Sequence, residues 1–597
     1  MQQSISSCLF SGLKFLLSLS AFFAFAPLSA QVTTSGLDGR VMTGTELAIG
    51  ATITLTHEPT GNVLHAVTNE EGEYHLSGLR PGGPYTVTVS YLGHLSKRFD
   101  NVRLMVGKRT LLSCELEDDR QQLHEVVVAG HRNSKLHIDH AGATTDIGSA
   151  AISQMPTVSR SLNDLLRLTP QSVFIGNGIA IGGGNYRQSH ISVDGAAFNN
   201  SFGIGSNLPG NGSPISFDAL DQMTISSSPF DVRLSGFTGG AVNVVTKSGS
   251  NQLQGSAYTY TTNIHLKGNK VGDEEMLRNA SHSTTWGLTL GGPIIKNKLF
   301  FFVNGEYDNN VTAGPSAVAR HAESDPWQVS TGNTHRPLAS ELNTLVGFLN
   351  ERYGYHPGAY QGYSLDTPGH KVFAQLDWLI NSNNSLNIRL SRSRTKASNA
   401  PSSSTTPFRD YLIYPGNPSE GLSSGRDLSG RTANTGMYFE SSRFTQVYDY
   451  TVATAEWNSR WGGLTNLFRL TYAYQDEPRE YVGGTFPTVD ILKDGALWAS
   501  FGPDPFTAGN LRRVKTFVAV DELQYSWKNH QLMAGIQYET NEATNGFGAA
   551  SNGYYVYSSV DDFYNNSKPA AYGVTFPMNG SGQFLSKMKY NQLSLYV

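Results

Sequence analysis

Phe468-Arg469-Leu470-Thr471-Tyr472-Ala473-Tyr474-Gln475 alternates apolar and polar side chains with a period of two residues. Successive side chains of a strand point to opposite faces, so this stretch predicts a strand with one apolar and one polar face. The same alternation recurs in ten stretches, near 255–266, 283–291, 298–308, 374–380, 386–391, 448–458, 468–475, 522–527, 534–539 and 588–597. About ten residues is the length of a strand that crosses a bilayer.

The connections between these stretches alternate between short and long. The short ones cover 293–298, 381–384, 459–463 and 528–530, and the long ones cover 267–282, 309–369, 396–447, 476–514 and 541–586. Short periplasmic turns and long outer loops are typical of an outer-membrane β-barrel. A soluble all-β protein is the alternative, but it does not require this strict order.

A β-wall in a bilayer is apolar outside and wet inside. We therefore expect the apolar set of each stretch to face lipid, including Tyr258 and Tyr260 of the first one. We expect the carboxylates on the opposite face to be solvated pore-lining groups, namely Glu306, Asp377 and Glu539.

Composition narrows the class of protein further. The chain has 597 residues, a net charge of −4 and only 15% charged residues, which argues against general nucleic-acid binding. Residues 1–30 are typical of a secretory signal peptide, since Lys14 precedes an apolar run over 15–26 and Ala30 offers a cleavage site. No later apolar run reaches 18 residues, so any further membrane span is β. Only Cys114 would remain after cleavage, so we expect no disulfide framework.

Residues 31–118 contain short strand signals separated by turns, which predicts a small β-sandwich. Four segments carry a resemblance to the carboxypeptidase-regulatory-like domain, namely 39–41, 50–53, 68–74 and 79–82. That fold is an accessory domain in its family, so the resemblance does not imply peptidase activity.

Residues 119–140 are predicted to form a polar linker that contains one apolar, strand-forming run, Leu123–Gly130. Such a run can pair as a strand with the edge of a partner, or it can add one more strand to the preceding sandwich. The linker also holds His124, His131, His137 and His140. We expect these histidines to be solvated, and we predict no metal site.

Residues 141–248 combine a short helix near 161–169, glycine-rich loops and short strands. Segments 165–170, 191–195, 229–233 and 239–249 resemble the plug of TonB-dependent outer-membrane receptors, and 291–302 resembles their first barrel hairpin. Together with the regulatory-like domain, the layout is similar to the Oar-like subgroup. The resemblance implies a mainly β protein with an N-terminal β-sandwich, an α+β plug at 141–248 and a transmembrane antiparallel β-barrel from 249. It also implies about 22 barrel strands, of which 249–597 supplies the first ten or so, so we expect a fragment or a truncated gene.

The resemblance also implies a site and partners. The predicted TonB box is Glu125, Val126, Val127, Val128 and Ala129. The partners would be a TonB-type energy-transducing protein, outer-membrane lipid of a Gram-negative bacterium and an unknown extracellular ligand. Loops of the plug would contact that ligand or pack against the barrel wall, through Tyr186, Arg187, Phe198, Asn199, Asn200 and Phe202.

Enzyme motifs are missing. Gly176-x-Gly178 lacks a third glycine at Ile181, and His57-Glu58 runs directly into Pro59 rather than into an HExxH motif. We predict no catalytic residue and no cofactor. The leading hypothesis is energy-coupled import of a large ligand, and the alternative is an outer-membrane adhesin or surface-structural protein on the same fold. Iron chelates, glycans and peptides all remain compatible as ligands.

Overall fold

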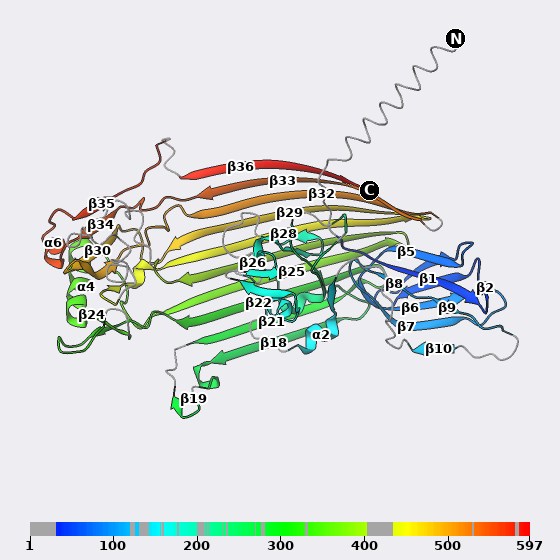
Figure 1. Ribbon diagram of the computed structural model, residues 1–597, viewed down its shortest axis with the longest axis horizontal. Coiled ribbons are helices and arrows are strands. Elements are labelled where there is room, and N and C mark those ends of the chain that lie inside the picture. The colour runs from blue at the N-terminus through cyan, green and yellow to red at the C-terminus, as the bar shows by residue number, and fades with distance from the viewer. Residues whose placement is uncertain are drawn as a thin grey trace, which may run out of the picture.

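The computed structural model describes residues 32–119, 126–129, 143–155, 157, 160–175, 178–199, 208, 212, 214–229, 231–233, 237–268, 270–275, 281–328, 332–402, 434–527, 530–578 and 584–597. The chain forms four parts. Residues up to 248 form two of them, and residues 249–597 form a long sheet whose connections make the fourth; Figure 1 shows their order along the chain from blue to red. The predicted signal peptide, the four linker histidines, Glu125, Asn200 and Phe202 lie outside the described residues.

The first part, here called the sandwich, consists of two five-stranded sheets. One sheet has β2 (Glu46–Leu47), β1 (Ser35–Thr43) and β5 (Glu73–Leu79) in that order, with β8 (Arg109–Leu111) and β9 (Cys114–Glu115) also pairing β1. The other has the order β10 (Val126–Ala129), β7 (Lys97–Leu104), β6 (Gly82–Ser90), β3 (Thr52–His57) and β4 (Asn62–Val67). Buried Leu37, Ile53, Leu55 and Val87 fill the space between the two sheets.

The second part, the long sheet, contains ten antiparallel strands, as the ten alternating stretches predict. Its order is β18 (Gln254–Asn263), β21 (His282–Ile295), β22 (Leu299–Ala313), β25 (Ser364–Asn381), β26 (Asn384–Asn399), β28 (Phe444–Trp461), β29 (Leu464–Tyr481), β32 (Leu511–Trp527), β33 (His530–Gly546) and β36 (Leu585–Tyr596). Strand neighbours in the sequence are neighbours in space, which gives an up-and-down meander with β18 and β36 at the ends of the path.

The outer face of the long sheet is apolar, because side chains such as Trp286, Leu288, Ile388 and Trp457 are exposed on it. The prediction for β18 is wrong. Tyr258 and Tyr260 point to the inner face, where the guanidinium of Arg160 lies 4.1 Å from the Tyr260 ring centroid. Tyrosine carries an apolar ring and a polar hydroxyl, so simple alternation does not decide which face it takes.

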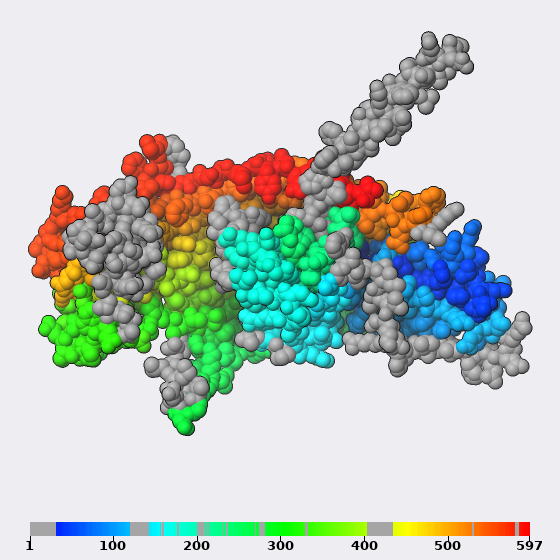
Figure 2. All heavy atoms as spheres, in the orientation of Figure 1, coloured from blue at the N-terminus to red at the C-terminus, as the bar shows by residue number. Residues whose placement is uncertain are grey.

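The third part, the central domain, comprises residues 143–248 and lies against the inner face of the long sheet (Figures 1 and 2). Its sheet has the order β11 (Thr144–Ile147), β16 (Leu220–Ser226), β17 (Ala241–Thr246), β14 (His190–Val193) and β15 (Ala196–Ala197). The helices α2 (Ser149–Gln154) and α3 (Leu162–Leu166) and the hairpin of β12 (Ser172–Ile175) and β13 (Gly178–Ile181) complete it. Its core continues into Phe302 and Phe373 of the long sheet.

The fourth part, the cap, forms from the long connections, which we expected only as loops. Its sheet has the order β27 (Met437–Tyr438), β31 (Ala496–Phe501), β30 (Thr488–Lys493), β34 (Tyr554–Tyr557) and β35 (Ala571–Gly573). Helices α4 (Ala339–Tyr353) and α6 (Val560–Tyr564) and the strand pair β23 (Val318–Arg320) and β24 (Thr334–Leu338) join it. The sandwich and the cap lie at opposite ends of the long strands (Figure 1).

Among the described residues, no helix is both long and apolar enough to cross a membrane.

Candidate functional site

The central domain meets the long sheet through buried polar groups at three places. At the first place, Glu306 of β22 accepts hydrogen bonds from Ser216 Oγ of the central domain and from Tyr258 OH, each at 2.9 Å. Lys371 Nζ of β25 lies 2.8 Å from the same carboxylate. A buried carboxylate with three partners is satisfied and fixed in position.

The second place is centred on Asp194, which follows β14 in a tight turn. Its carboxylate accepts from the amide of Thr246 at 3.0 Å and from the Thr246 hydroxyl at 2.6 Å. That hydroxyl lies 3.2 Å from Gln375 Oε1 on β25. Arg389 of β26 lies 3.9 Å from Asp194 and 3.7 Å from Glu456, so one cation links the central domain to the long sheet.

At the third place, Arg233 of the central domain approaches Glu522 of β32, with 3.8 Å between Nη1 and Oε1. Arg233 is also held by Asp231, at 2.7 Å. The hydroxyl of Tyr596 donates to the same glutamate at 3.1 Å. Together, the contacts at these three places attach the central domain to strands of the long sheet from β22 to β32.

The expectation that Glu306 and Asp377 are solvated pore-lining groups is wrong. Both side chains are buried, and each one has a charged partner from another part of the chain or from a neighbouring strand. Burial in a medium of low polarity requires such a partner, because an isolated carboxylate would lose its hydration without compensation. Glu539 is half-buried and accepts from the amide of Asn541.

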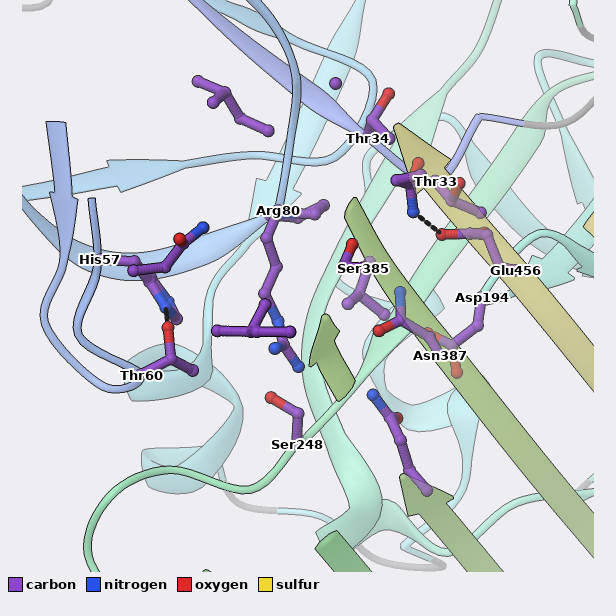
Figure 3. Close-up of a pocket in the computed structure, with 18 of the residues that line it drawn as sticks. Thr33, Thr34, His57, Thr60, Arg80, Asp194, Ser248, Ser385, Asn387 and Glu456 are labelled. Carbon is purple, nitrogen blue, oxygen red and sulfur yellow. Dashed lines mark hydrogen bonds between the residues drawn. The ribbon is translucent and has the colours of Figure 1, made fainter. Parts of the chain in front are cut away.

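A polar cavity of about 120 Å³ lies where the sandwich, the central domain and the long sheet meet (Figure 3). The sandwich contributes His57, Thr60 and Arg80, and the central domain contributes Asp194. The long sheet contributes Ser385, Asn387 and Glu456. The His57 ring nitrogen Nδ1 lies 2.7 Å from Thr60 Oγ1, and burial, followed by the charge of Arg80, lowers the pKa of His57 to about 3. This histidine is therefore neutral at pH 7.

Four residues of the predicted TonB box form β10, which pairs in parallel with β7. Val126, Val127 and Val128 are in register with Lys97, Arg98 and Phe99. Of the two readings of this run, the structure places it as an extra strand on the sandwich. A strand at the edge of a sheet is paired on one side only, and it can leave the sheet to pair with a strand of another protein. This placement therefore leaves the run available for a partner.

The predicted ligand-contact residues divide into two groups. Phe198 is only 2% exposed and packs edge-to-face on Tyr450 at 5.2 Å. Asn199 donates to Ser189 O at 2.7 Å and accepts from the amide of Ile191 at 2.8 Å. Asn199 therefore holds the central domain together, and Phe198 packs it on the long sheet, which is the packing alternative given for these loops.

The other group is open to solvent. Arg187 is exposed, and its guanidinium lies 5.3 Å from the ring of half-buried Tyr186. These two side chains can still meet a ligand. Among the described residues, no group of three or more His, Cys, Asp or Glu side chains could hold a metal ion.

Sequence reasoning missed the partners of the buried charges and the cap. Arg80 and Asp377 are 297 positions apart, and no spacing rule connects them. A carboxylate that alternates with apolar outward residues, as Asp377 does with Leu376 and Trp378, is the available signal for such a contact.

Comparison with known proteins agrees with this architecture. Residues 245–588 match the model of the outer membrane beta barrel domain, and residues 36–117 match that of the carboxypeptidase regulatory-like domain. The TonB-dependent transporter Oar of Myxococcus xanthus is 26% identical over 254 residues, which cover 40% of this chain and 23% of Oar.

Among solved structures, the outer membrane transporter YddB of Escherichia coli matches with a TM-score of 0.50 and 11% identity, over 76% of this chain and 53% of YddB. This chain thus spans less than two thirds of the length of either relative. Because the barrel model covers more than half of the chain, the chain belongs to the outer membrane beta barrel family, with a regulatory-like domain ahead of the barrel strands, and its location is the outer membrane of a Gram-negative cell.

Proposed function

We propose that this protein is a TonB-dependent outer-membrane transporter, not an enzyme, that imports a large ligand with energy transmitted from the inner membrane. The central domain is its plug, and Glu125–Ala129 is its TonB box. The cap faces the exterior, and the sandwich faces the periplasm.

One observation carries the proposal, namely that the attachment of the central domain to the wall includes the polar groups around Glu306, Asp194 and Glu522. Contacts between domains that are rich in hydrogen bonds and ion pairs allow relative motion, because water can replace each contact in turn. A plug that must move during each import cycle needs an attachment of this kind.

The outer membrane has no energy source of its own, so the work must come from a partner that reaches across the periplasm. Val126–Ala129 is already extended and lies on the edge of a sheet. A strand in this conformation can add to a sheet edge of the partner through main-chain hydrogen bonds. Ligand bound outside would shift the population toward a state in which this strand is released.

The cap favours a second candidate function. It has its own buried aromatic core and its own sheet, so it is a folded outer domain rather than a set of flexible loops. Such a domain could serve in adhesion as well as in ligand capture.

Deletion of residues 125–129 separates the two functions. For a transporter, uptake of the nutrients that support growth should be lost, whereas adhesion should be unaffected. Growth of a chromosomal deletion strain on single candidate nutrients identifies the ligand class first. Uptake that continues at the normal rate without these five residues contradicts the proposal.

A milder pair of variants tests the mechanism in vitro. Val127→Pro removes a backbone N–H from the run, whereas Val127→Ala keeps it. Binding of the C-terminal domain of the cell's TonB-type protein should be lost with proline and retained with alanine. Equal binding of both variants would show that strand addition is not the mode of recognition.

A further inference from the structure

The sandwich is fastened to the short-turn end of the long sheet by contacts with three of its strands and turns. Arg80 pairs with Asp377 of β25 at 3.1 Å, and Asp377 is almost completely buried. Arg460 of β28 donates to the carbonyl of Gly78 at 2.7 Å. The amide of Asn251, just before β18, donates to the carbonyl of Pro59 at 2.7 Å.

The sandwich also holds the central domain directly. Lys108 Nζ donates to Thr144 Oγ1 at 3.1 Å and forms an ion pair with Asp146, and both partners are on β11. Asp146 is further held by the hydroxyl of Thr224 at 3.0 Å. β11 is an edge strand of the central sheet, since among the described residues it pairs with β16 alone. It is also the first element of the central domain after the TonB-box run.

We propose that the sandwich is a latch, a domain that holds β11 in place and must undock before the plug can move. This role rests on the proposed function in one respect, namely that force reaches the plug from residues 125–129. Along the chain, β11 is the first strand of the central domain after the box, so a force applied to the box acts on β11 before it acts on any other strand of that domain. Lys108 opposes this force, because the sandwich that carries Lys108 is attached to β25 and β28.

The interface between the sandwich and the long sheet is suited to opening. The cavity of about 120 Å³ at its centre leaves the interface incompletely packed, so little apolar contact is lost on undocking. The contacts at its margin are polar and can be hydrated once they open. The exception is Asp377, whose only ion pair within 4 Å among the described residues is with Arg80, although Gln375 also donates to its carboxylate at 2.8 Å. Loss of Arg80 removes the nearest cation from a buried carboxylate, so we expect Arg80 to determine the docked population.

A disulfide can report docking in the whole chain. Gly78 has a φ of 64°, so a cysteine there carries some backbone strain, but its Cβ would lie 3.8 Å from the Cβ of Thr465 on β29, a separation found in natural disulfides. The test uses Gly78→Cys with Thr465→Cys in a Cys114→Ser background, and mild oxidation should cross-link it, as seen by gel mobility. Arg80→Ala should reduce the rate of cross-linking by about tenfold or more. Reactive thiols that do not cross-link in the folded protein would overturn docking.

Hydrogen exchange of the β11 amides tests the latch itself. Lys108→Ala should accelerate exchange of β11 by about tenfold, the effect of losing a partly buried charged contact. Lys97→Ala is the matched control, because Lys97 Nζ donates to the carbonyl of Glu115 within the sandwich and, in the described part of the chain, forms no hydrogen bond or ion pair with the central domain. Oxidation of the Gly78/Thr465 pair should slow β11 exchange, and reduction should restore it. Equal exchange in the Lys108 and Lys97 variants would overturn the proposal.

Neither measurement involves a TonB-type protein. Failure of the box variants with intact latch behaviour would therefore refute the proposed function alone. Loss of coupling between the sandwich and β11, with normal partner binding, would refute only the latch.

Discussion

The hydroxyl of Tyr258 donates a 2.9 Å hydrogen bond to Glu306 across the face of Gly287. The three residues are in register on β18, β21 and β22. The opposite end of the path repeats this arrangement, since Tyr596 donates to Glu522 at 3.1 Å across the glycine between them, Gly535. At each end a tyrosine covers a glycine and orients a glutamate that also contacts the central domain.

Gly287→Ala should disrupt the first of these rows. An added Cβ would overlap the ring of Tyr258, so the ring must move and its hydrogen bond to Glu306 must lengthen or break. We expect a loss of stability of about 1–3 kcal/mol, which is typical of overpacking. Thermal unfolding in detergent, followed by circular dichroism, measures it.

Gly305→Ala is the control, because a Cβ there would meet no atom within 4 Å. It should be neutral or slightly stabilising, since alanine restricts the unfolded chain. Equal effects of the two substitutions would show that Tyr258 does not depend on the glycine.

Lys371→Met should be more damaging than Gly287→Ala. It leaves Glu306 buried without its cation, which costs about 3–5 kcal/mol. Adding Glu306→Gln should recover part of the loss, because a neutral amide oxygen still accepts from Ser216 and Tyr258. Chemical denaturation of the single and double variants measures the coupling.

Lys396→Met provides the comparison, since the side chains of Lys396 and its partner Glu480 are 43% and 42% exposed. Its loss should cost less than about 1 kcal/mol. A Lys371 variant as stable as the Lys396 variant would mean that Glu306 does not need this cation and is reached by water.

Sequence periodicity was sufficient for the long sheet because each strand has one apolar face exposed along most of its length. Ile388 and Leu390, for example, alternate with Arg389 and Ser391, and the structure places the first pair outside and the second pair inside. Tyr258 escaped the rule because its ring and its hydroxyl have opposite preferences. The hydroxyl reaches Glu306, two strands away, and no local pattern contains that information.

The cap and the charged contacts could not be predicted for another reason. The cap strands are two to six residues long, too short for alternation to stand out from noise. Partners such as Lys108 and Asp146 come from different domains, so only the tertiary arrangement brings them together. The sequence could indicate which residue types would need partners, but not which partners they would have.

Acidification should destabilise the sandwich through His57. Its pKa of about 3 in the folded protein is below the value of 6.5 for a free side chain. Between these values the unfolded state binds more protons, so stability rises with pH and is lost as pH falls below about 6.5, by up to about 1.4 kcal/mol per pH unit. Hydrogen exchange of β3 and β6 across this range measures the slope.

His57→Asn isolates this effect, because its amide can still reach Thr60 but does not titrate in this range. The variant should show a flatter dependence between pH 4 and pH 6.5. An unchanged slope would assign the acid sensitivity between pH 4 and pH 6.5 to other groups of the sandwich.

The cap should unfold independently of the long sheet. Phe501 is fully buried in the cap and lies 5.4 Å from Phe563 and 6.2 Å from Phe486, between ring centroids. Phe501→Ala should therefore destabilise the cap by about 3–5 kcal/mol. Limited proteolysis should then cut between residues 482 and 510, while hydrogen exchange of β28 and β29 stays slow.

Phe576→Ala is the control, because that side chain is largely exposed. Simultaneous loss of protection in the cap and in β28 would instead make the cap a cooperative part of the barrel wall.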